Sequence, residues 1–431
     1  MNRAKKSSKL YQTALFGSVI ATTATLSIFG PVFTNSVRAA LQDSPKAVLD
    51  EAWQIVNREY VDGNFNQVDW QATRVSLLSK NYSTREEAYN ELRQALKQLG
   101  DPYTRFLDPK QYEALTNQTS GELSGVGIQL EVNNNNQLLT VVKPIDNSPA
   151  FRAGIKAGDR IIAIDGKPTV GMNVEAAAKL IRGKVGTPVT LRISREKGED
   201  FSITLQREKI EVETVRYSVK QEDNTRIGYI YLQEFNSHAG EQMRRAIQKL
   251  SAEKVDAFVL DLRGNPGGLL QASIEIARMW IDNGAIVRTV DRDGKNDELK
   301  ANRSALTNLP LAVLVDGHSA SASEILAGAL KDNNRATIIG SQTFGKALVQ
   351  SVHPLSDGSG VSVTIAHYYT PKGTDISHKG ITPDVKIDLT DTQKQDLAAN
   401  PNLVGTQKDP QYANAITILK SKNIGRPLAV K

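Results

Sequence analysis

The chain has 431 residues, of which 40% are hydrophobic and 23% charged, and its formal net charge is +6. This length exceeds one ordinary domain of about 150 residues and indicates two or three domains, while the composition is typical of a soluble globular protein. The chain contains no cysteine. That excludes disulfides, a thiolate nucleophile and cysteine-ligated metal, and it suits an oxidising compartment.

Residues 1–39 have the layout of a secretory signal peptide. Basic residues within 3–9 precede an apolar stretch over 14–33, and a Val-Arg-Ala pattern at 37–39 fits a cleavage site. The apolar stretch is longer than a usual signal core, so an uncleaved membrane anchor is the alternative. This segment holds five Lys/Arg and no Asp/Glu, which leaves +1 for the rest of the chain. We therefore expect an exported protein and no nucleic-acid partner.

Residues 40–120 read as a small helical N-terminal domain. Apolar residues recur at helical spacing between Pro45 and Val61. A second helix is predicted to start at the capping box formed by Ser83 and Glu86 and to stop before Gly100.

A β-rich domain is expected over 121–210, because short apolar runs alternate there with Asn, Gly and Pro turns. One helix, Val174–Ile181, interrupts them. The predicted strands are Gly127–Val132, Leu138–Lys143, Arg160–Ile164 and Val189–Arg195.

Residues 211–390 alternate strand and helix patterns, which favours an α/β core. The predicted strands are Gly228–Leu232, Ala257–Asp261, Leu311–Asp316, Ala336–Ile339 and Val361–Tyr369, and the predicted helices are Gly240–Leu250, Leu269–Trp280 and Ser323–Leu330. Residues 391–431 are expected to form a polar C-terminal tail, either a peripheral helix or a partly disordered segment. The fold class is therefore α+β with several domains.

The run HSASASEILAGAL at 318–330 contains three serines, any of which needs a neighbouring base to become a nucleophile. His318 lies close in sequence, but that spacing does not aim its ring at a hydroxyl, and no G-x-S-x-G elbow is present. Lys346 lies in the apolar setting TFGKALVQS, which would favour a neutral amine. Gln350, four residues on, can share its face and orient the amine. The alternative that Lys346 only extends from the end of a strand, without a catalytic role, stays open.

The stretch SASASEILAGALKDNNRATIIGSQTFGKALVQS (319–351) closely resembles the active-site block of the carboxyl-terminal processing proteases, or tail-specific proteases. The resemblance implies that Ser321 is the nucleophile, that Lys346, 25 residues later, is the base, and that Gln350 orients it. Ser319 and Ser323 then have structural roles, with Ser323 as a helix cap. The family usually has glycine where Ala347 stands, and a left-handed backbone there would cost alanine about 1 kcal/mol.

DLRGNPGGLLQA (261–272) resembles the family's loop at a helix N-terminus, where unpaired N–H groups suit an oxyanion. We expect the amides of Gly267 and Ala322 to form the oxyanion hole. Asp261, Arg263 and Glu324 match supporting positions of the family. Charge-assisted hydrogen bonds would let them buttress the loop, and a surface salt bridge is the alternative.

Residues 121–210 resemble a PDZ domain through GVGI (125–128) and SPAFRAGIKAGDRIIAIDG (148–166). The resemblance implies that a peptide carboxylate binds at the backbone of Gly125, Val126, Gly127 and Ile128 while the peptide adds as a strand. An arginine at the position of Arg182 helps to couple peptide binding to activity in family members.

The resemblance covers about residues 45–385, including DPYTRFLDP (101–109). It implies a crotonase-like α/β core and a serine endopeptidase that needs no metal or cofactor. The partners would be C-terminal tails of exported or membrane proteins. Among the members of this family, the sequence most resembles the enzymes of oxygenic phototrophs that trim the photosystem II reaction-centre precursor. We therefore expect the protein in the periplasm or the thylakoid lumen.

Two other functional classes stay open from the sequence. One is a non-catalytic PDZ scaffold that holds peptide tails, and the other is a histidine-based hydrolase or acyl-CoA enzyme on a related core. Membrane association, peripheral or anchored, and oligomeric state are also left open.

Overall fold

The computed structural model describes residues 44–133, 138–196, 198 and 200–421, so the expected signal segment 1–39 lies outside the described residues. Within these ranges no helix has the length and apolar character needed to cross a bilayer.

The N-terminal helices are α2 (Pro45–Glu59), α3 (Trp70–Ser79) and α4 (Arg85–Lys97), and their core contains Leu49, Trp53 and Leu92. The same core includes Val361 and Val363 of the long strand β18 (Gly360–Tyr369). The bundle therefore closes only on a strand from the other end of the chain. The short strand β1 (Arg105–Leu107) also pairs antiparallel with β18.

The N-cap of α4 lies one residue later than predicted. Thr84 is the N-cap and accepts a hydrogen bond from the Glu87 N–H at 3.2 Å, while the Glu87 carboxylate accepts from the Ser83 N–H at 2.8 Å. The prediction with Ser83 and Glu86 is therefore wrong, because Thr84 and Glu87 offer the same spacing one residue later. Helix α3 was not expected, since only Trp70 and Leu77 of it are buried.

The β-rich domain follows α5 (Pro109–Ser120) and has its own hydrophobic core. Its main sheet has the order β3-β4-β5-β7-β8, with β6 beside β5, and β2 pairs with β9. Helix α7 (Val174–Ile181) has the predicted bounds and buries Ala177 and Ile181. The strands are β2 (Glu122–Gly125), β3 (Ile128–Val132), β4 (Leu139–Pro144), β5 (Arg160–Ile164), β6 (Lys167–Pro168), β7 (Pro188–Ser194), β8 (Phe201–Gln206) and β9 (Glu208–Glu211), and a short helix is α6 (Pro149–Arg152).

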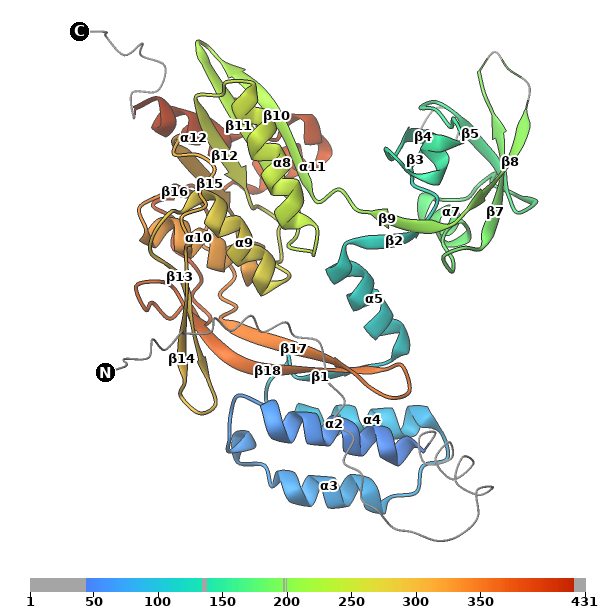
Figure 1. The fold of residues 1–431 in the computed structure, drawn as a ribbon, viewed down its shortest axis with the longest axis vertical. Helices are drawn as coiled ribbons and strands as arrows, with labels where there is room; N and C mark the ends of the chain where they lie inside the picture. Colours follow the sequence, from blue (N-terminus) through green and yellow to red (C-terminus); the bar gives the residue numbers. More distant parts are fainter. Residues whose placement is uncertain (1–43, 134–137, 197, 199, 422–431) are drawn as a thin grey trace, which may run out of the picture. The chain divides into compact units, whose positions relative to one another are not determined.

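The core domain contains a six-stranded sheet of order β10-β11-β12-β15-β16-β19, parallel except for the β10–β11 pair. Helices α8, α9 and α10 cover one face and α12 the other (Figure 1). The bounds are β10 (Val215–Glu222), β11 (Thr225–Leu232), α8 (Ala239–Ala252), β12 (Ala257–Asp261), α9 (Leu270–Trp280), β15 (Leu311–Val315), α10 (Ala322–Asp332), β16 (Thr337–Gly340) and β19 (Val385–Lys386).

A second, antiparallel sheet of order β1-β18-β13-β14, with β17 also beside β18, packs next to this core. Its remaining strands are β13 (Ala285–Asp291), β14 (Asn296–Lys300) and β17 (Leu348–Pro354). Strand β17 begins two residues after Lys346, so the position of this lysine depends on the second sheet rather than on the first.

The C-terminal segment differs from the expected polar tail. It contains α11 (Asp391–Ala399) and α12 (Pro410–Ser421), and α12 packs on the six-stranded sheet. The residues Tyr412, Ala415, Ile416 and Leu419 are buried at the spacing of one helix face. Their polar neighbours lower the average hydropathy and obscure this pattern in a composition-based interpretation.

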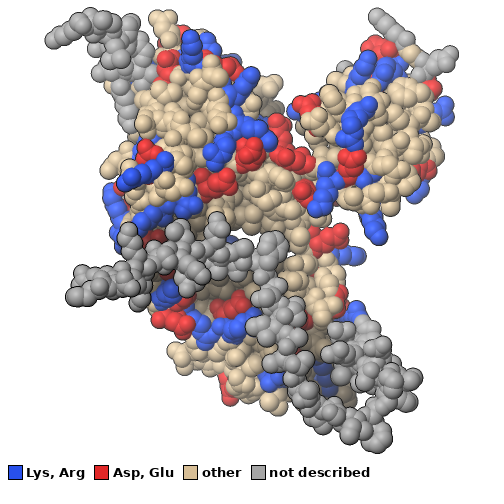
Figure 2. Space-filling model, in the orientation of Figure 1, with Lys and Arg blue, Asp and Glu red and all other residues tan. Residues whose placement is uncertain are grey.

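Figure 2 shows Lys and Arg side chains interspersed with Asp and Glu over the face in view, without an extended patch of one sign. The surface on this side is therefore mixed rather than basic. The excess positive charge of the whole chain resides mostly in residues 1–39.

Candidate active site

The two loops that carry the predicted motifs leave the same edge of the six-stranded sheet, because β12 and β15 are parallel neighbours. The outer serines of the SASAS run fasten these loops together. The Ser319 hydroxyl donates to the Leu262 carbonyl at 2.9 Å, and the Ser323 hydroxyl donates to the Asn265 carbonyl at 2.9 Å. Ser323 is thus a buried residue inside α10, and the prediction that it caps the helix is wrong. The N-cap position belongs to Ser321.

Ser321 has a backbone conformation that is rare for a side-chain-bearing residue, with φ +53° and ψ −112°. Such strain costs on the order of 1–3 kcal/mol and persists only where the surroundings hold it. Here the Ser321 N–H donates to the Glu324 carboxylate at 2.8 Å. The strained turn places Ser321 at the wall of a cavity of about 520 Å³, which we call the Ser321 cavity.

The Ser321 cavity brings together segments that lie far apart in the chain. Lys346 and Gln350 line it with Ser321, and Ala322, Pro266 and Gly268 contribute from the two loops. All five histidines belong to the described part of the chain, and none of them lines this cavity. His318 is exposed, and its backbone N–H donates to Asp316. Lys346, and no histidine, therefore shares the wall of this cavity with Ser321.

Lys346 is partly buried in this cavity. Burial lowers the pKa of Lys346 below its ordinary value of 10.5, and the positive charge of Arg105 lowers it further, while Asp101 and Glu324 act in the opposite direction. The Lys346 Nζ lies 4.5 Å from the centroid of the Tyr103 ring. The contact places the Lys346 side chain against the segment that follows the N-terminal helices.

Alanine at position 347 causes no backbone strain. Gly345, not Ala347, has the left-handed backbone in this turn, with φ +92°. A Cβ on Gly345 would lie 2.7 Å from the Lys379 nitrogen. The glycine that this turn requires is therefore present, and the departure of Ala347 from the family pattern has no conformational cost.

Gln350 lies in β17 where the register with β18 shifts between Val349 and Gln350. Its Nε2 is buried and has no hydrogen-bond partner among the described residues. A buried amide donor without a partner costs about 1–3 kcal/mol. Its place in the wall of the Ser321 cavity makes an incoming group or the Lys346 amine the natural acceptor.

Glu324 is fully buried and connects the segments that carry Ser321 and Lys346. Its carboxylate accepts from the backbone N–H of Ser321 at 2.8 Å and of Lys346 at 3.0 Å. It also accepts from the Gly345 N–H at 2.7 Å and from the Thr343 hydroxyl at 2.6 Å. Burial raises the pKa of Glu324, and the four donors work against that rise. One carboxylate thus sets the positions of both segments.

Tyr368 of β18 contacts the carbonyl groups of the same two residues, Ser321 and Lys346. Its buried hydroxyl lies within hydrogen-bonding distance of the carbonyl oxygens of Ser321, at 3.2 Å, and of Lys346. The N–H groups of Ser321 and Lys346 therefore bind Glu324, and their carbonyl groups face Tyr368. The sequence motifs did not point to Tyr368, because its hydroxyl reaches the site only through the pairing of β17 with β18.

A Glu324→Gln substitution is expected to reduce kcat about 10- to 100-fold with little change in KM. The amide keeps the volume but turns an acceptor into a donor that faces N–H groups, which costs about 1–3 kcal/mol. Steady-state kinetics on a peptide substrate measures the effect. Glu275→Gln, at an exposed ion pair with Arg244, is the matched control and should be silent. An unchanged kcat in Glu324→Gln would contradict this positioning role.

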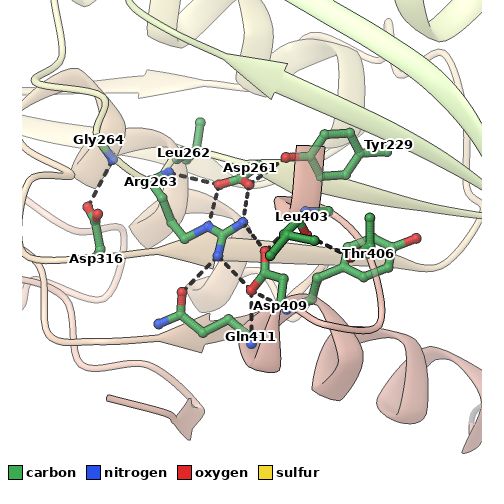
Figure 3. A network of polar contacts seen from close by, with 12 residues as sticks. Tyr229, Asp261, Leu262, Arg263, Gly264, Asp316, Leu403, Thr406, Asp409 and Gln411 are labelled. Atoms are coloured by element: carbon green, nitrogen blue, oxygen red, sulfur yellow. Dashed lines mark hydrogen bonds and ion pairs between the residues drawn. The ribbon is translucent and has the colours of Figure 1, made fainter. Parts of the chain in front are cut away.

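The Arg263 side chain lies in a buried polar network at the end of β12 (Figure 3). Its guanidinium binds Asp261 at 2.9 Å through Nε and Asp409 at 2.7 Å through Nη2, and Gln411 accepts from Nη1 at 3.0 Å. Burial alone would lower the pKa of Arg263, but the two carboxylates raise it. The Tyr229 hydroxyl donates to Asp261 at 2.7 Å. The geometry is that of a buried network and not of a surface salt bridge.

The candidate oxyanion donors lie beside Ser321. Ala322 N–H is the first amide of α10 and has no acceptor among the described residues. The Gly267 N–H donates to the Asn265 side chain at 2.9 Å, whereas Gly268 lines the Ser321 cavity and its N–H has no acceptor in the described chain. A Cβ on Gly267 would lie 2.9 Å from the Ala322 nitrogen, so this close approach requires glycine.

The residues predicted to bind a peptide carboxylate lie between β2 and β3 and do not line the Ser321 cavity. Gly127 has φ +75°, and a Cβ there would lie 2.2 Å from the Ser148 Cβ, so only glycine fits. Val126 is buried in the domain core, next to Gly125 and Ile128. Arg182 is exposed directly after α7.

Comparison with known proteins matches two parts of the chain to known families. Peptidase family S41 matches residues 226–387, and the PDZ domain matches residues 140–195. A carboxyl-terminal-processing protease of Picosynechococcus sp. is 42% identical over 91% of this chain and 92% of its own length. One of Synechocystis sp. is 41% identical over 89% of both chains.

A solved structure of a photosystem II D1 C-terminal processing protease is 35% identical and covers 86% of this chain and 99% of its own, with a TM-score of 0.54. The PDZ domain and the α/β peptidase core together place this chain in the class of PDZ-containing serine peptidases. The chain belongs to peptidase family S41, and it is a carboxyl-terminal-processing peptidase. The expected fold class and enzyme class are thereby confirmed.

Proposed function

We propose that Ser321 is the nucleophile and neutral Lys346 the general base of this peptidase. The observation that carries the proposal is the meeting of both residues at one cavity that no histidine lines, together with the lowered pKa of Lys346. A lysine that is neutral near the working pH can take the proton of a serine hydroxyl. Gln350 then orients the amine of Lys346 through its unpartnered amide.

The reaction proceeds through an acyl-enzyme. The Ser321 Oγ bonds to the scissile carbonyl carbon while its proton passes to Lys346 Nζ, and the carbonyl oxygen becomes an oxyanion. The Ala322 amide and an amide of the Gly267–Gly268 turn stabilise this oxygen, and each donor contributes about 3 kcal/mol to transition-state stabilisation. The peptide C–N bond then breaks as Lys346 passes its proton to the leaving amine. In deacylation Lys346 takes a proton from the attacking water and returns it to Ser321 Oγ as the acyl C–Oγ bond breaks.

The PDZ domain supplies recognition of the tail. A terminal carboxylate docks at the backbone of Gly125, Val126, Gly127 and Ile128, and the tail adds as a strand between this loop and α7. The left-handed Gly127 supports this role, because it allows successive N–H groups to converge. Arg182, exposed at the end of α7, couples the bound tail to the core. A free C-terminus is therefore part of the recognition signal.

The substrates are exported or membrane proteins with exposed C-terminal tails, in the periplasm or the thylakoid lumen. The relatives include a chloroplastic carboxyl-terminal-processing peptidase of Arabidopsis thaliana and the photosystem II D1 processing protease described above. These similarities support the photosystem II reaction-centre precursor as a substrate of this chain.

Incubation with peptides that carry a free or an amidated C-terminus tests both halves of the proposal. Wild type is expected to cleave the free peptide at least 10-fold faster than the amidated one, since a docked carboxylate contributes charge-assisted hydrogen bonds. Ser321→Ala should leave both intact, and the exposed Ser356→Ala should behave as wild type. Mass spectrometry measures the products. Indifference to amidation removes tail recognition, and cleavage by Ser321→Ala removes the nucleophile.

A further inference from the structure

The segment DPYTRFL (101–107) is fixed to the core beside the Ser321 cavity, although sequence analysis assigned it no function. The Asp101 carboxylate accepts from the Tyr103 N–H at 2.9 Å and from the hydroxyls of Thr104 at 2.7 Å and Thr364 at 2.6 Å. The Thr104 hydroxyl in turn accepts from the Thr364 N–H at 3.0 Å. The turn is therefore tied to β18, which holds the next residue, Arg105, at a defined place.

Arg105 lines two cavities at once. One is the Ser321 cavity, and the other, which we call the Arg93 cavity, also has about 520 Å³ and is bordered by Arg93, Lys97 and Asp101. Pro102 and Arg105 belong to both walls. The two spaces therefore adjoin at Arg105, and an extended peptide in the Ser321 cavity can place a side chain or its end beside this guanidinium.

The guanidinium of Arg105 has no hydrogen-bond or ion-pair partner among the described residues, and neither has the amine of Lys97. Arg93 differs, because it pairs with Glu86 at 2.8 Å and with Asp108 at 3.5 Å. The one acid that borders the Arg93 cavity is Asp101, whose carboxylate is already bound by the three donors described above. Two cations thus face this space without a counter-ion from the surrounding chain.

We propose that Arg105, supported by Lys97, forms a subsite for a carboxylate of the peptide substrate next to the scissile bond. Arg105 and Lys97 are both exposed, so a substrate can reach them, and a guanidinium fork matches a carboxylate in shape and charge. The proposal deepens the proposed function, on which it rests. The carboxylate comes either from an Asp or Glu side chain or from the end of the tail, and the experiment separates these two sources.

The subsite also affects the proposed base. The charged groups that act on Lys346 are Arg105, Asp101 and Glu324. The ring of Tyr103 lies beside its amine, and the Tyr368 hydroxyl contacts its main-chain carbonyl. Because the charge of Arg105 lowers the pKa of Lys346, a carboxylate bound to Arg105 should offset this effect. The pH profile of kcat is therefore expected to reach its plateau at higher pH for an acidic substrate than for its amide analogue.

The test uses the full chain and a peptide that wild type cleaves, with Glu, Gln or Lys placed in turn at three positions on each side of the scissile bond. At one position wild type is expected to prefer Glu over Gln by about 10-fold in kcat/KM, since a hydrogen bond to a charged group is worth about 1.5 kcal/mol or more. Arg105→Gln should abolish this preference, and Arg105→Glu should convert it into a preference for Lys. The control Lys110→Gln removes an exposed cation that lines neither cavity.

Free and amidated versions of each peptide identify the source of the carboxylate. A Glu-over-Gln preference that survives amidation and is lost in Arg105→Gln assigns the carboxylate to a side chain. A free-over-amidated preference that Arg105→Gln abolishes assigns it to the tail end, and one that Arg105→Gln leaves intact belongs to the PDZ domain. A wild type with neither preference, or one whose preferences all remain in Arg105→Gln, overturns the subsite. Ser321→Ala is included in each series, because its failure to abolish cleavage overturns the proposed function instead.

Discussion

Lys346→Met is expected to fold and to lose roughly 10⁴-fold in kcat, because the thioether keeps most of the volume and apolar contacts but cannot accept a proton. Ser321→Ala should lose as much, and the double variant should be little worse than either single one, since the two groups act as a unit. Single-turnover cleavage of a peptide substrate measures the effect, and circular dichroism confirms that the fold is intact.

The pH dependence of wild type follows from the same geometry. A general base works only when deprotonated, so kcat/KM should rise with pH and level off above the pKa of Lys346 in the free enzyme. Burial and the charge of Arg105 lower this pKa, while Asp101 and Glu324 oppose them, so the midpoint should lie below 10.5. Arg105→Gln removes one lowering influence and should move the midpoint to higher pH.

Two controls make the lysine prediction sharp. Lys372→Met changes an exposed lysine of the same domain and should leave kcat unchanged, and His318→Ala removes the nearest histidine in sequence. Activity that survives in Lys346→Met but disappears in His318→Ala would transfer the role of base to histidine. It would also contradict the proposal that the Ser321 cavity is the active site.

The second large effect is expected for stability. Arg263→Met should destabilise the core by about 3–5 kcal/mol, because it leaves the carboxylates of Asp261 and Asp409 buried without their counter-ion. Their exposed fractions are 1% and 0%, so water cannot replace the guanidinium. Hydrogen exchange of β12 and α12 measures the local effect directly, and both elements should exchange faster.

A matched pair of variants separates charge from packing in this network. Asp409→Asn in the Arg263→Met background removes one of the two unpaired charges and should recover part of the lost stability. Arg244→Met breaks an exposed pair with Glu275 at 3.7 Å and should change stability by less than about 1 kcal/mol. Equal effects of Arg263→Met and Arg244→Met would contradict the buried network.

The network also connects the end of the chain to the reaction. Arg263 belongs to the loop that continues to Gly267 and Gly268, and Asp409 lies directly before α12. Asp409 in addition accepts from the N–H groups of Gly405 at 3.1 Å and Gln411 at 3.2 Å, so its position is fixed from several sides. Arg263→Met is therefore expected to lower kcat as well as stability.

Local sequence patterns were sufficient to predict the bounds of an element where its own residues define it. The bounds of α7 and β12 agree with the predictions, because each has a clean period and clear turn signals at its ends. The prediction for the C-terminal segment missed α12. The apolar face of this helix is buried only because it packs on the six-stranded sheet. The capping signal of α4 was ambiguous because two overlapping boxes were present.

The candidate site was predicted from the sequence alone, through the residues of the SASAS and TFGK motifs, their spacing of 25 residues, and the resemblance they carry. The groups that surround these motifs became visible only in the folded chain. Glu324 and Tyr368 hold both segments through hydrogen bonds to the main chain, and Arg105 reaches the cavity because β1 pairs with β18. Such contacts join residues that are distant in the chain, and no local period or motif encodes them.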